Sequence, residues 1–281
     1  MRSGARVTIG DTTVLKTFDC VEAARSKYEA IHQLGLVHGF HAPAVLACDQ
    51  ATGALTLEKV EGITSLRQHY IGYLRDPSAG DGFLSMVRTA GEALAHIHHG
   101  LEADSAADWT ASPEFEAAFA RYGLAPGALM SGPTRLLHCD YGYSNLFVQD
   151  LGSGQSRLVV LDPSPDGSTS MRHWLRGPVH LDIGRMLGCL EGAAVPLMLT
   201  SRLAPRAVWR AQDAFLGGYE AIAGTRPDPY VALGWGYALF ATQASQRSRV
   251  RGYFRRNLRY NSWPRKNFPV ARKADQIGHH E

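Results

Sequence analysis

The 281-residue sequence lacks the marks of several common protein classes. Its four cysteines lie far apart and form no C-x-x-C pair, which suggests neither a zinc site nor a redox pair. The N-terminus has no apolar signal-peptide core, and no run of about 18 uninterrupted apolar residues occurs. Because scattered free thiols suit a reducing compartment, we expect a cytoplasmic protein.

The sequence also has only a moderate share of charged residues and few prolines. Apolar residues make up 45% of the chain and charged residues 20%, with 14 prolines, which is the composition of a folded globular protein. This excludes disorder as the main state and a small disulfide-stapled scaffold. The length allows one large domain or two of ordinary size.

Basic residues are concentrated at the C-terminus. Residues 246–281 contain ten Lys or Arg and two acidic residues, a balance of +8, whereas the rest of the chain has a balance of −5. Aromatic residues lie between the arginines. The pattern is compatible with an acidic peptide or another polyanion as a partner, and equally with a solvated face or a tail packed by its aromatic residues.

The first 60 residues predict a small sheet interrupted by one helix. Alternating runs at 6–9 and 13–18 around a Gly-Asp pair are typical of a β-hairpin. Apolar residues then recur at helical spacing over 20–35, and two further strands are predicted at 44–48 and 54–60.

Helical patterns dominate after Gly62. We predict helices at 83–99, 113–122, 179–191, 205–223 and 229–246, with short apolar runs at 136–148 and 157–162 as the exception. The sequence therefore predicts two parts. A β-rich lobe would span residues 1–61, and a mainly helical lobe would span residues 62–281.

One constellation carries most of the chemistry. An apolar pair is followed by His138, Asp140 and, after four more residues, Asn145 with an apolar triplet. A β-branched run then ends at Asp162. A carboxylate at the end of a buried strand is costly unless it binds a cation or accepts several hydrogen bonds. Together these residues supply the oxygen ligands and the base of a Mg-nucleotide site.

This constellation resembles the aminoglycoside phosphotransferase and choline kinase branch of the protein-kinase-like fold. His138, Asp140 and Asn145 match that family's H-G-D-x-x-x-x-N loop, with Cys139 in place of the usual glycine. Asp162 matches the metal-binding Asp that stands in place of D-F-G. The resemblance implies an α+β, bilobal fold with a small β-rich N-lobe and a larger, mainly helical C-lobe. In such a fold the N-lobe at 1–61 would bind nucleotide, and the C-lobe at 62–281 would carry the catalytic loop and the acceptor site.

Other segments resemble the family more weakly, and the match covers residues 5–190. Lys16 lies in a strand that resembles the one carrying the nucleotide-binding lysine, and Glu29 lies in a helix that resembles the one carrying its glutamate partner. The segment around Glu58 and Val60 resembles the hinge between lobes. Asp182 resembles the start of the family's D-L-A helix.

The resemblance implies a role for each nucleotide-binding residue. Lys16 would hold the α- and β-phosphates of ATP or another nucleoside triphosphate, with Glu29 as its ion-pair partner. The backbone around Glu58 and Val60 would pair with adenine.

It also implies the chemistry. Asn145 and Asp162 would hold Mg²⁺, and Asp140 would accept the proton of the attacking hydroxyl. His138 and Asp182 would brace the catalytic loop.

The sequence departs from the family in two places. Only fifteen residues precede Lys16, so the usual first strand and its glycine-rich loop are expected to be shortened or missing. Gly142 stands where protein kinases carry a cation, so another donor, Arg172 or His173, would be needed to neutralise the transferring phosphoryl group.

Two functions stay open. The first is an ATP- and Mg-dependent phosphotransferase acting on a hydroxyl of a small molecule or peptide. The second is a catalytically weak kinase-like protein that binds a nucleotide or a partner through its basic C-terminal region. If that region borders the acceptor cleft, polycationic aminoglycosides would be repelled and poorly phosphorylated. The cluster of His96, His98 and His99 could also suggest a metal site. However, on a helix only His96 and His99 share a face, and no third ligand is nearby.

Overall fold

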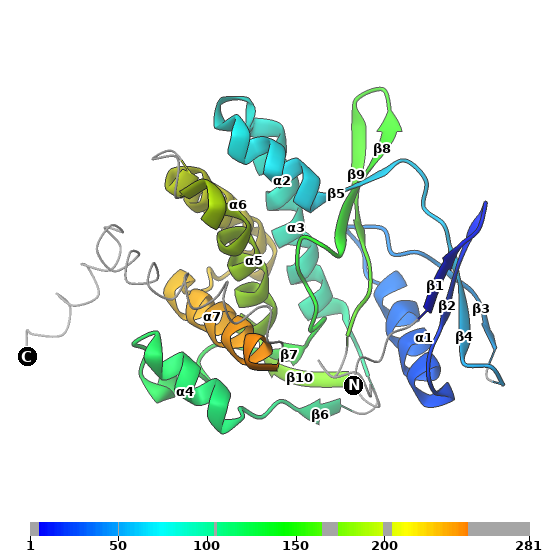
Figure 1. Ribbon diagram of the computed structural model, residues 1–281, viewed down its shortest axis with the longest axis horizontal. Coiled ribbons are helices and arrows are strands. Elements are labelled where there is room, and N and C mark those ends of the chain that lie inside the picture. Colours follow the sequence, from blue (N-terminus) through cyan, green and yellow to red (C-terminus); the bar gives the residue numbers. More distant parts are fainter. Residues whose placement is uncertain (1–5, 50, 104–105, 165–173, 199–203, 247–281) are drawn as a thin grey trace, which may run out of the picture.

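The computed structural model describes residues 6–49, 51–103, 106–164, 174–198 and 204–246. Figure 1 shows a small sheet with one helix, next to a larger part made mainly of helices. This arrangement confirms the α+β, bilobal class expected from the sequence.

The small sheet has four strands in the order β1-β2-β4-β3. Strands β1 (Arg6–Ile9) and β2 (Thr13–Thr17) form the predicted antiparallel hairpin, and β2 also pairs with β4 (Ala54–Glu58). Strand β3 (Val45–Asp49) pairs with the outer side of β4 through an irregular register.

Helix α1 (Val21–Gly35) covers one face of this sheet (Figure 1). Ile31 on the helix packs against Leu55 and Leu57 of β4 and forms a small separate core. The buried face of α1 contains five apolar residues and one charged residue, Lys27. A lysine on an apolar face requires a partner, because burying an uncompensated charge is costly.

A second sheet connects the two parts. Its order is β5-β8-β9, with β5 at Ile63–Ser65, β8 at Leu146–Gly152 and β9 at Gln155–Val160. The segment between α1 and β3 is hydrogen bonded to β9: the His41 amide donates to Leu158, and the Val160 amide donates to His41, at 2.8 and 2.9 Å. The small sheet is therefore fixed to the strand that leads to Asp162.

The larger part is built on helices that pack across one another. These are α2 (Leu66–Arg75), α3 (Asp81–Gly100), α4 (Pro113–Arg121), α5 (His180–Met198), α6 (Ala204–Ala223) and α7 (Pro229–Gln246), with 3₁₀ turns η1 (Pro77–Ala79) and η2 (Pro126–Ala128). Helices α3, α5 and α6 contribute to the main apolar core, and α4 and α7 contribute to a second core around Trp235.

Helices α3 and α6 approach so closely that only glycine fits at their crossing. A Cβ on Gly218 would lie 2.0 Å from the Arg88 carbonyl oxygen, and one on Gly91 would lie 2.0 Å from the Phe215 carbonyl oxygen. The contact is thus made backbone to backbone, and it holds the middle of α3 close to α6.

A third sheet, β6-β10-β7, lies beneath the helices, with β6 at Ala106–Asp108, β7 at Thr134–Leu136 and β10 at Trp174–Pro178. Strand β7 leads into the loop that contains Asp140, and β10 leads into α5. Their antiparallel pairing brings these two chain segments together although they are about 40 residues apart in sequence.

Most predicted elements are present, and some were missed. The helices predicted at 83–99, 113–122, 205–223 and 229–246 correspond to α3, α4, α6 and α7, and α5 extends beyond its predicted end. The sequence analysis missed α2, which Ser65 and Gln68 open with a reciprocal capping box. It also missed the short strands β5, β6 and β10, whereas the apolar run predicted to begin at residue 136 overlaps the end of β7. Within the described residues, no helix is long and apolar enough to span a membrane.

Candidate active site

Asp182 organises the predicted catalytic loop. Its side chain is fully buried at the start of α5, where it accepts hydrogen bonds from the backbone amides of His138 and Cys139 at 2.7 and 2.8 Å. A carboxylate that accepts several hydrogen bonds can stay ionised away from water. The loop after β7 is therefore held in place by a buried charge from a distant helix.

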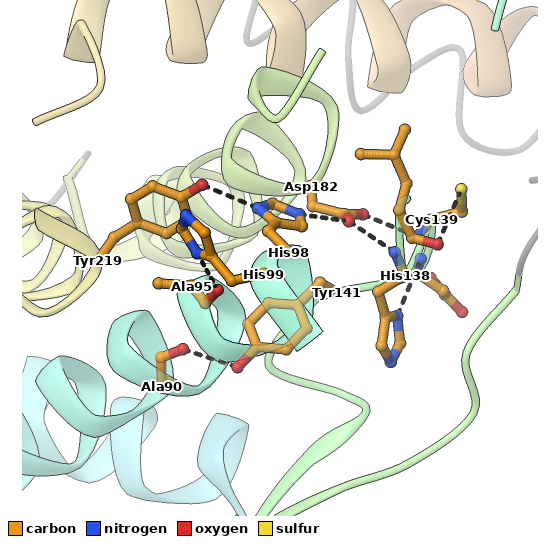
Figure 2. Close-up of polar contacts among 11 residues, drawn as sticks. Ala90, Ala95, His98, His99, His138, Cys139, Tyr141, Asp182 and Tyr219 are labelled. Atoms are coloured by element: carbon orange, nitrogen blue, oxygen red, sulfur yellow. Dashed lines mark hydrogen bonds and ion pairs between the residues drawn. The ribbon is translucent and has the colours of Figure 1, made fainter. Parts of the chain in front are cut away.

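The same carboxylate receives a third hydrogen bond, from α3. Figure 2 shows Asp182 between the His98 ring and the loop backbone. His98 Nε2 donates to Asp182 at 3.1 Å, and His98 Nδ1 lies 2.9 Å from the Tyr219 hydroxyl on α6. The network thus connects α6, α3 and α5 to the loop, and the helical core supports the loop directly.

Cys139 occupies a backbone conformation that favours glycine. Its φ is +63°, in the left-handed region, and its side chain is buried. A non-glycine residue there costs roughly 1–2 kcal/mol, which explains why the resembling family has glycine at this position. In this backbone conformation, the Cys139 amide donates its hydrogen bond to Asp182.

His138 lies beneath the loop in a neutral state. Its Nδ1 accepts a hydrogen bond from the Asp140 amide at 3.3 Å, and its ring meets Tyr141 edge-on. Burial lowers the pKa of His138 to about 4, although the carboxylates of Asp182 and Asp140 oppose this shift. The ring therefore supports the turn before Asp140 without adding charge.

Asp140 pairs with Arg185, a residue to which the sequence analysis assigned no role. The Arg185 guanidinium on α5 contacts one carboxylate oxygen of Asp140, and both side chains are mostly buried. Arg185 follows Asp182 by three residues, so the same helix turn holds the loop backbone and the candidate base. A cation thus lies beside Asp140 although Gly142 replaces the usual one.

Asn145 and Asp162 lie side by side at the ends of two paired strands. Strands β8 and β9 are antiparallel with Leu146 opposite Val160, and the Leu161 amide donates to the Asn145 carbonyl at 2.9 Å. The Asn145 side-chain amide donates to the Asp140 carbonyl at 3.0 Å, so its side-chain oxygen faces elsewhere. The structure brings together the three residues that the motif predicted to act together.

Two lysines converge on Asp162. Lys16 from β2 forms an ion pair with its Oδ1 atom, and Lys27 from α1 lies 3.6 Å from the same oxygen. Lys27 also donates to the Pro163 carbonyl at 2.5 Å. Burial raises the pKa of Asp162, but the two ammonium groups outweigh it, so the pKa is lower than usual. Burial also lowers the pKa of Lys27, against the attraction of Asp162.

The expected pairing of Lys16 with Glu29 is absent from the described structure. Glu29 lies on the exposed side of α1, where its carboxylate pairs with Arg25 at 3.0 Å. The reason is helical periodicity: Lys27 faces the site, and a residue two positions later points to the opposite side of the helix. Asp162 replaces Glu29 as the partner of Lys16, and Lys27 occupies the inward position.

The hinge segment is held by backbone and side-chain contacts. The Glu58 amide donates to the Ala44 carbonyl at 2.9 Å, and its carboxylate accepts from the Ala44 amide at 3.0 Å and lies 3.3 Å from His41. The Lys59 amide donates to Thr12. Among the described residues, no hydrogen bond from the Val60 amide occurs.

Some expectations concern residues outside the described ranges. Arg172 and His173, suggested to neutralise the charge of the transferring phosphoryl group, lie there, as does the basic segment at 247–281. The metal reading of the three histidines is not supported, because His98 binds Asp182 and His99 binds the Ala95 carbonyl. Among the described residues, no cluster of three or more metal-binding side chains occurs.

The sequence analysis assigned no role at the site to three residues that contact it, namely Lys27, His98 and Arg185. Two of them left a signal in the sequence: Lys27 falls at the helical spacing of the buried apolar residues of α1, and His98 falls on the buried face of α3. A polar residue on an apolar helix face indicates a buried partner. Arg185 left no such signal, because its partner is fixed only by the loop geometry.

Comparisons with known proteins support the class of fold that this site and its two lobes define. No family model matches the chain, and no curated protein matches its sequence. Solved structures do match. A glucosamine kinase in complex with glucosamine, ADP and inorganic phosphate aligns with a TM-score of 0.62 at 18% identity, over 99% of this chain and 83% of that chain.

Two further structures are similar. Another crystal form of glucosamine kinase aligns with a TM-score of 0.58 at 19% identity, over 92% of this chain and 72% of that chain. A choline/ethanolamine kinase family protein from Mesorhizobium loti aligns with a TM-score of 0.53 at 15% identity, over 96% and 89% of the two chains. The chain therefore has the fold of these small-molecule kinases.

Proposed function

We propose that this protein is an ATP- and magnesium-dependent phosphotransferase that transfers a phosphoryl group to a hydroxyl of a small molecule. The observation that carries the proposal is the convergence of Lys16, Asp140, Asn145 and Asp162 from three separate segments of the chain, namely β2, the loop between β7 and β8, and the end of β9. Structural cores do not require such a convergence of charged groups, whereas phosphoryl transfer does.

The donor set fits a magnesium ion. Asp162 has one carboxylate oxygen, Oδ2, outside its contacts with the lysines, and the Asn145 side-chain oxygen lies outside its described hydrogen bond. Hard oxygen ligands from one or two side chains, completed by phosphates and water, are the usual protein contribution to a Mg²⁺ site. A bound ion would neutralise phosphate charge during transfer.

The protein's own groups would position the reactants. Lys16 would turn from Asp162 to the nucleotide phosphates, and the Val60 amide would donate to the adenine ring. Asp140 would accept the proton of the acceptor hydroxyl through its Oδ2 atom, since Oδ1 is held by Arg185. Arg185 would keep the carboxylate oriented until a substrate arrives.

The structural neighbours support a small acceptor. The glucosamine kinase was solved with glucosamine, ADP and inorganic phosphate bound, and this chain aligns with it along almost its whole length. We therefore favour a small hydroxylated molecule, of the size of an amino sugar or amino alcohol, over a peptide. Which of these compounds is phosphorylated is a question for a substrate panel.

The test is Asp140→Asn, assayed by calorimetric ATP binding and by phosphoryl transfer to a panel of amino sugars and amino alcohols. The substitution keeps the shape of the side chain but removes the proton acceptor. We expect nucleotide binding within about threefold of the native protein and transfer reduced by at least about 100-fold.

The matched control is Asp150→Asn, which changes an exposed turn carboxylate that accepts from the Gly152 amide. This control should retain full transfer. Normal turnover by Asp140→Asn would assign Asp140 a structural role. A native protein that binds ATP but transfers to no acceptor in the panel would favour the alternative, a kinase-like binding module.

A further inference from the structure

The buried lysine of α1 gives this site an unusual charge. In a site with the lysine–glutamate pair that the resemblance implied, the groups around the metal-binding aspartate would sum to −1. Here Lys16, Lys27 and Asp162 sum to +1, because the inward position of the helix carries a lysine. The adjacent pair of Asp140 and Arg185 is neutral. The phosphate side of the site is thus two charges more positive.

The geometry makes this charge available to a ligand. Both ammonium groups contact the same Oδ1 atom of Asp162, so one carboxylate oxygen compensates two cations. Asp162 is 37% exposed, and Lys16 and Lys27 are 13% and 7% exposed. Asp162 is therefore the most solvent-exposed of the three side chains, and an anion that displaced its carboxylate would meet two largely buried ammonium groups.

Lys27 is held in place independently of Asp162. Its Nζ atom donates to the Pro163 carbonyl at 2.5 Å, and its stem lies on the packed face of α1 beside Ala23, Ala30 and Ile31. The carbonyl fixes the ammonium group at the strand end even when Asp162 turns away. Such a preorganised donor loses little freedom when it binds a phosphate oxygen.

We propose that Lys27 is a second phosphate-binding lysine, and that it allows this site to bind nucleotide polyphosphates with little dependence on a divalent cation. The inference rests on the proposed function and adds to it the role of Lys27. In a lysine–glutamate site, metal is needed to offset two carboxylates and the phosphates. In this chain, Lys27 supplies part of that positive charge as a fixed protein group.

The experiment is calorimetric titration of the full chain with ADP and with ATP, in excess Mg²⁺ and in excess chelator. For the native protein we expect chelation to weaken ADP binding by less than about tenfold. For Lys27→Met, we expect binding in chelator to weaken by a further tenfold or more, and binding with Mg²⁺ to weaken by about threefold or less.

Three variants serve as controls. Lys27→Arg keeps the positive charge and should restore most of the binding in chelator. Lys27→Glu recreates a lysine–glutamate pair and should make binding strongly metal-dependent. Arg25→Met removes a cation from the exposed side of the same helix and should change neither titration. Thermal unfolding of each variant, followed by circular dichroism, identifies any loss of fold.

The outcomes separate this inference from the proposed function. Tight binding of Mg-nucleotide that chelation weakens by more than about 100-fold would overturn the inference and leave the proposed function standing. The same holds if Lys27→Met folds and binds in chelator as the native protein does. If Lys27→Met does not fold, the chelation series on the native protein and on Lys27→Arg still decides the question. Absence of nucleotide binding in both conditions would refute the proposed function itself.

Discussion

Removing the buried carboxylate of Asp182 should have large effects on both stability and activity. Asp182 is fully buried and accepts from two loop amides and from His98. Hydrogen bonds to a charged group contribute about 1.5–3 kcal/mol each, but such contributions do not add fully within one network. Breaking a buried charged network by removing one partner typically costs about 3–5 kcal/mol.

We therefore expect Asp182→Ala to lower the free energy of unfolding by about 4 kcal/mol. Asp182→Asn keeps one acceptor oxygen and should cost about 2 kcal/mol. With a slope of about 3 kcal/mol per molar urea, the alanine variant should unfold at a urea concentration about 1–1.5 M lower. Transfer activity should fall with it, because the amides of His138 and Cys139 lose the group that positions the loop.

The assay is urea unfolding followed by circular dichroism and tryptophan fluorescence. The matched control is Asp150→Ala, since Asp150 accepts a backbone amide at 2.8 Å in an exposed turn. An exposed carboxylate is replaced by water at little cost, so this variant should lose less than about 1 kcal/mol. If the Asp182→Ala and Asp150→Ala midpoints agree within error, Asp182 does not hold the loop and the reasoning is refuted.

Three further predictions concern the loop and the helix crossing. Because the pKa of His138 is lowered to about 4 from 6.5, the unfolded chain binds the extra proton between these values, so stability falls as the pH drops through that window. His138→Asn should remove up to about 3 kcal/mol of that pH dependence. The measurement is the free energy of unfolding in urea at several pH values from 7 to 4.5, and the prediction is contradicted if it changes with pH as much in the variant as in the native protein. Cys139→Gly relieves a left-handed φ but removes a buried side chain, so its free energy of unfolding should stay within about 1 kcal/mol of the native value and its activity should persist. Cys139→Val places a β-branched side chain at this φ and should lower the free energy of unfolding by more than about 2 kcal/mol. Gly218→Ala should lower the free energy of unfolding by at least about 2 kcal/mol, because its Cβ would lie 2.0 Å from a backbone oxygen. The neighbouring Gly217→Ala should be neutral or stabilising, because the nearest atom to its Cβ is a flexible arginine nitrogen at 3.7 Å. Equal shifts in melting temperature for the two variants would disprove the close crossing.

Much of the fold could be predicted from the sequence because its elements are locally encoded. The hairpin at the N-terminus has alternating residues around a turn, and α3, α4, α6 and α7 have clear helical periodicity, so each was predicted close to its observed bounds. Strands β6 and β10, by contrast, are three and five residues long and have no alternation of their own. They form because they pair with one another across long stretches of chain, a stabilisation that no local window contains.

The candidate site follows the same division. The order and spacing of Asp140, Asn145 and Asp162 in the sequence were sufficient to predict that they act together, because Asn145 directly precedes β8, Asp162 follows β9, and Asp140 lies in the loop before β8. The sequence also determined the chemical types present, two carboxylates and a carboxamide. It could not determine the partner of Lys16, since Glu29 and Lys27 lie on the same helix and only its rotation about its axis decides which one faces the site.

The tertiary structure alone decided the charge of the site. Packing of Ile31 and its apolar neighbours against β4 sets the rotation of α1, which places Lys27 at Asp162 and leaves Glu29 in solvent. Likewise, the pairing of β7 with β10 brings α5 to the loop, and only then does Arg185 reach Asp140. Residue types and strand ends are local properties of the chain. The partner of a charged side chain is settled by the packing of whole elements, because that packing minimises exposed apolar surface without regard to which charges it brings together.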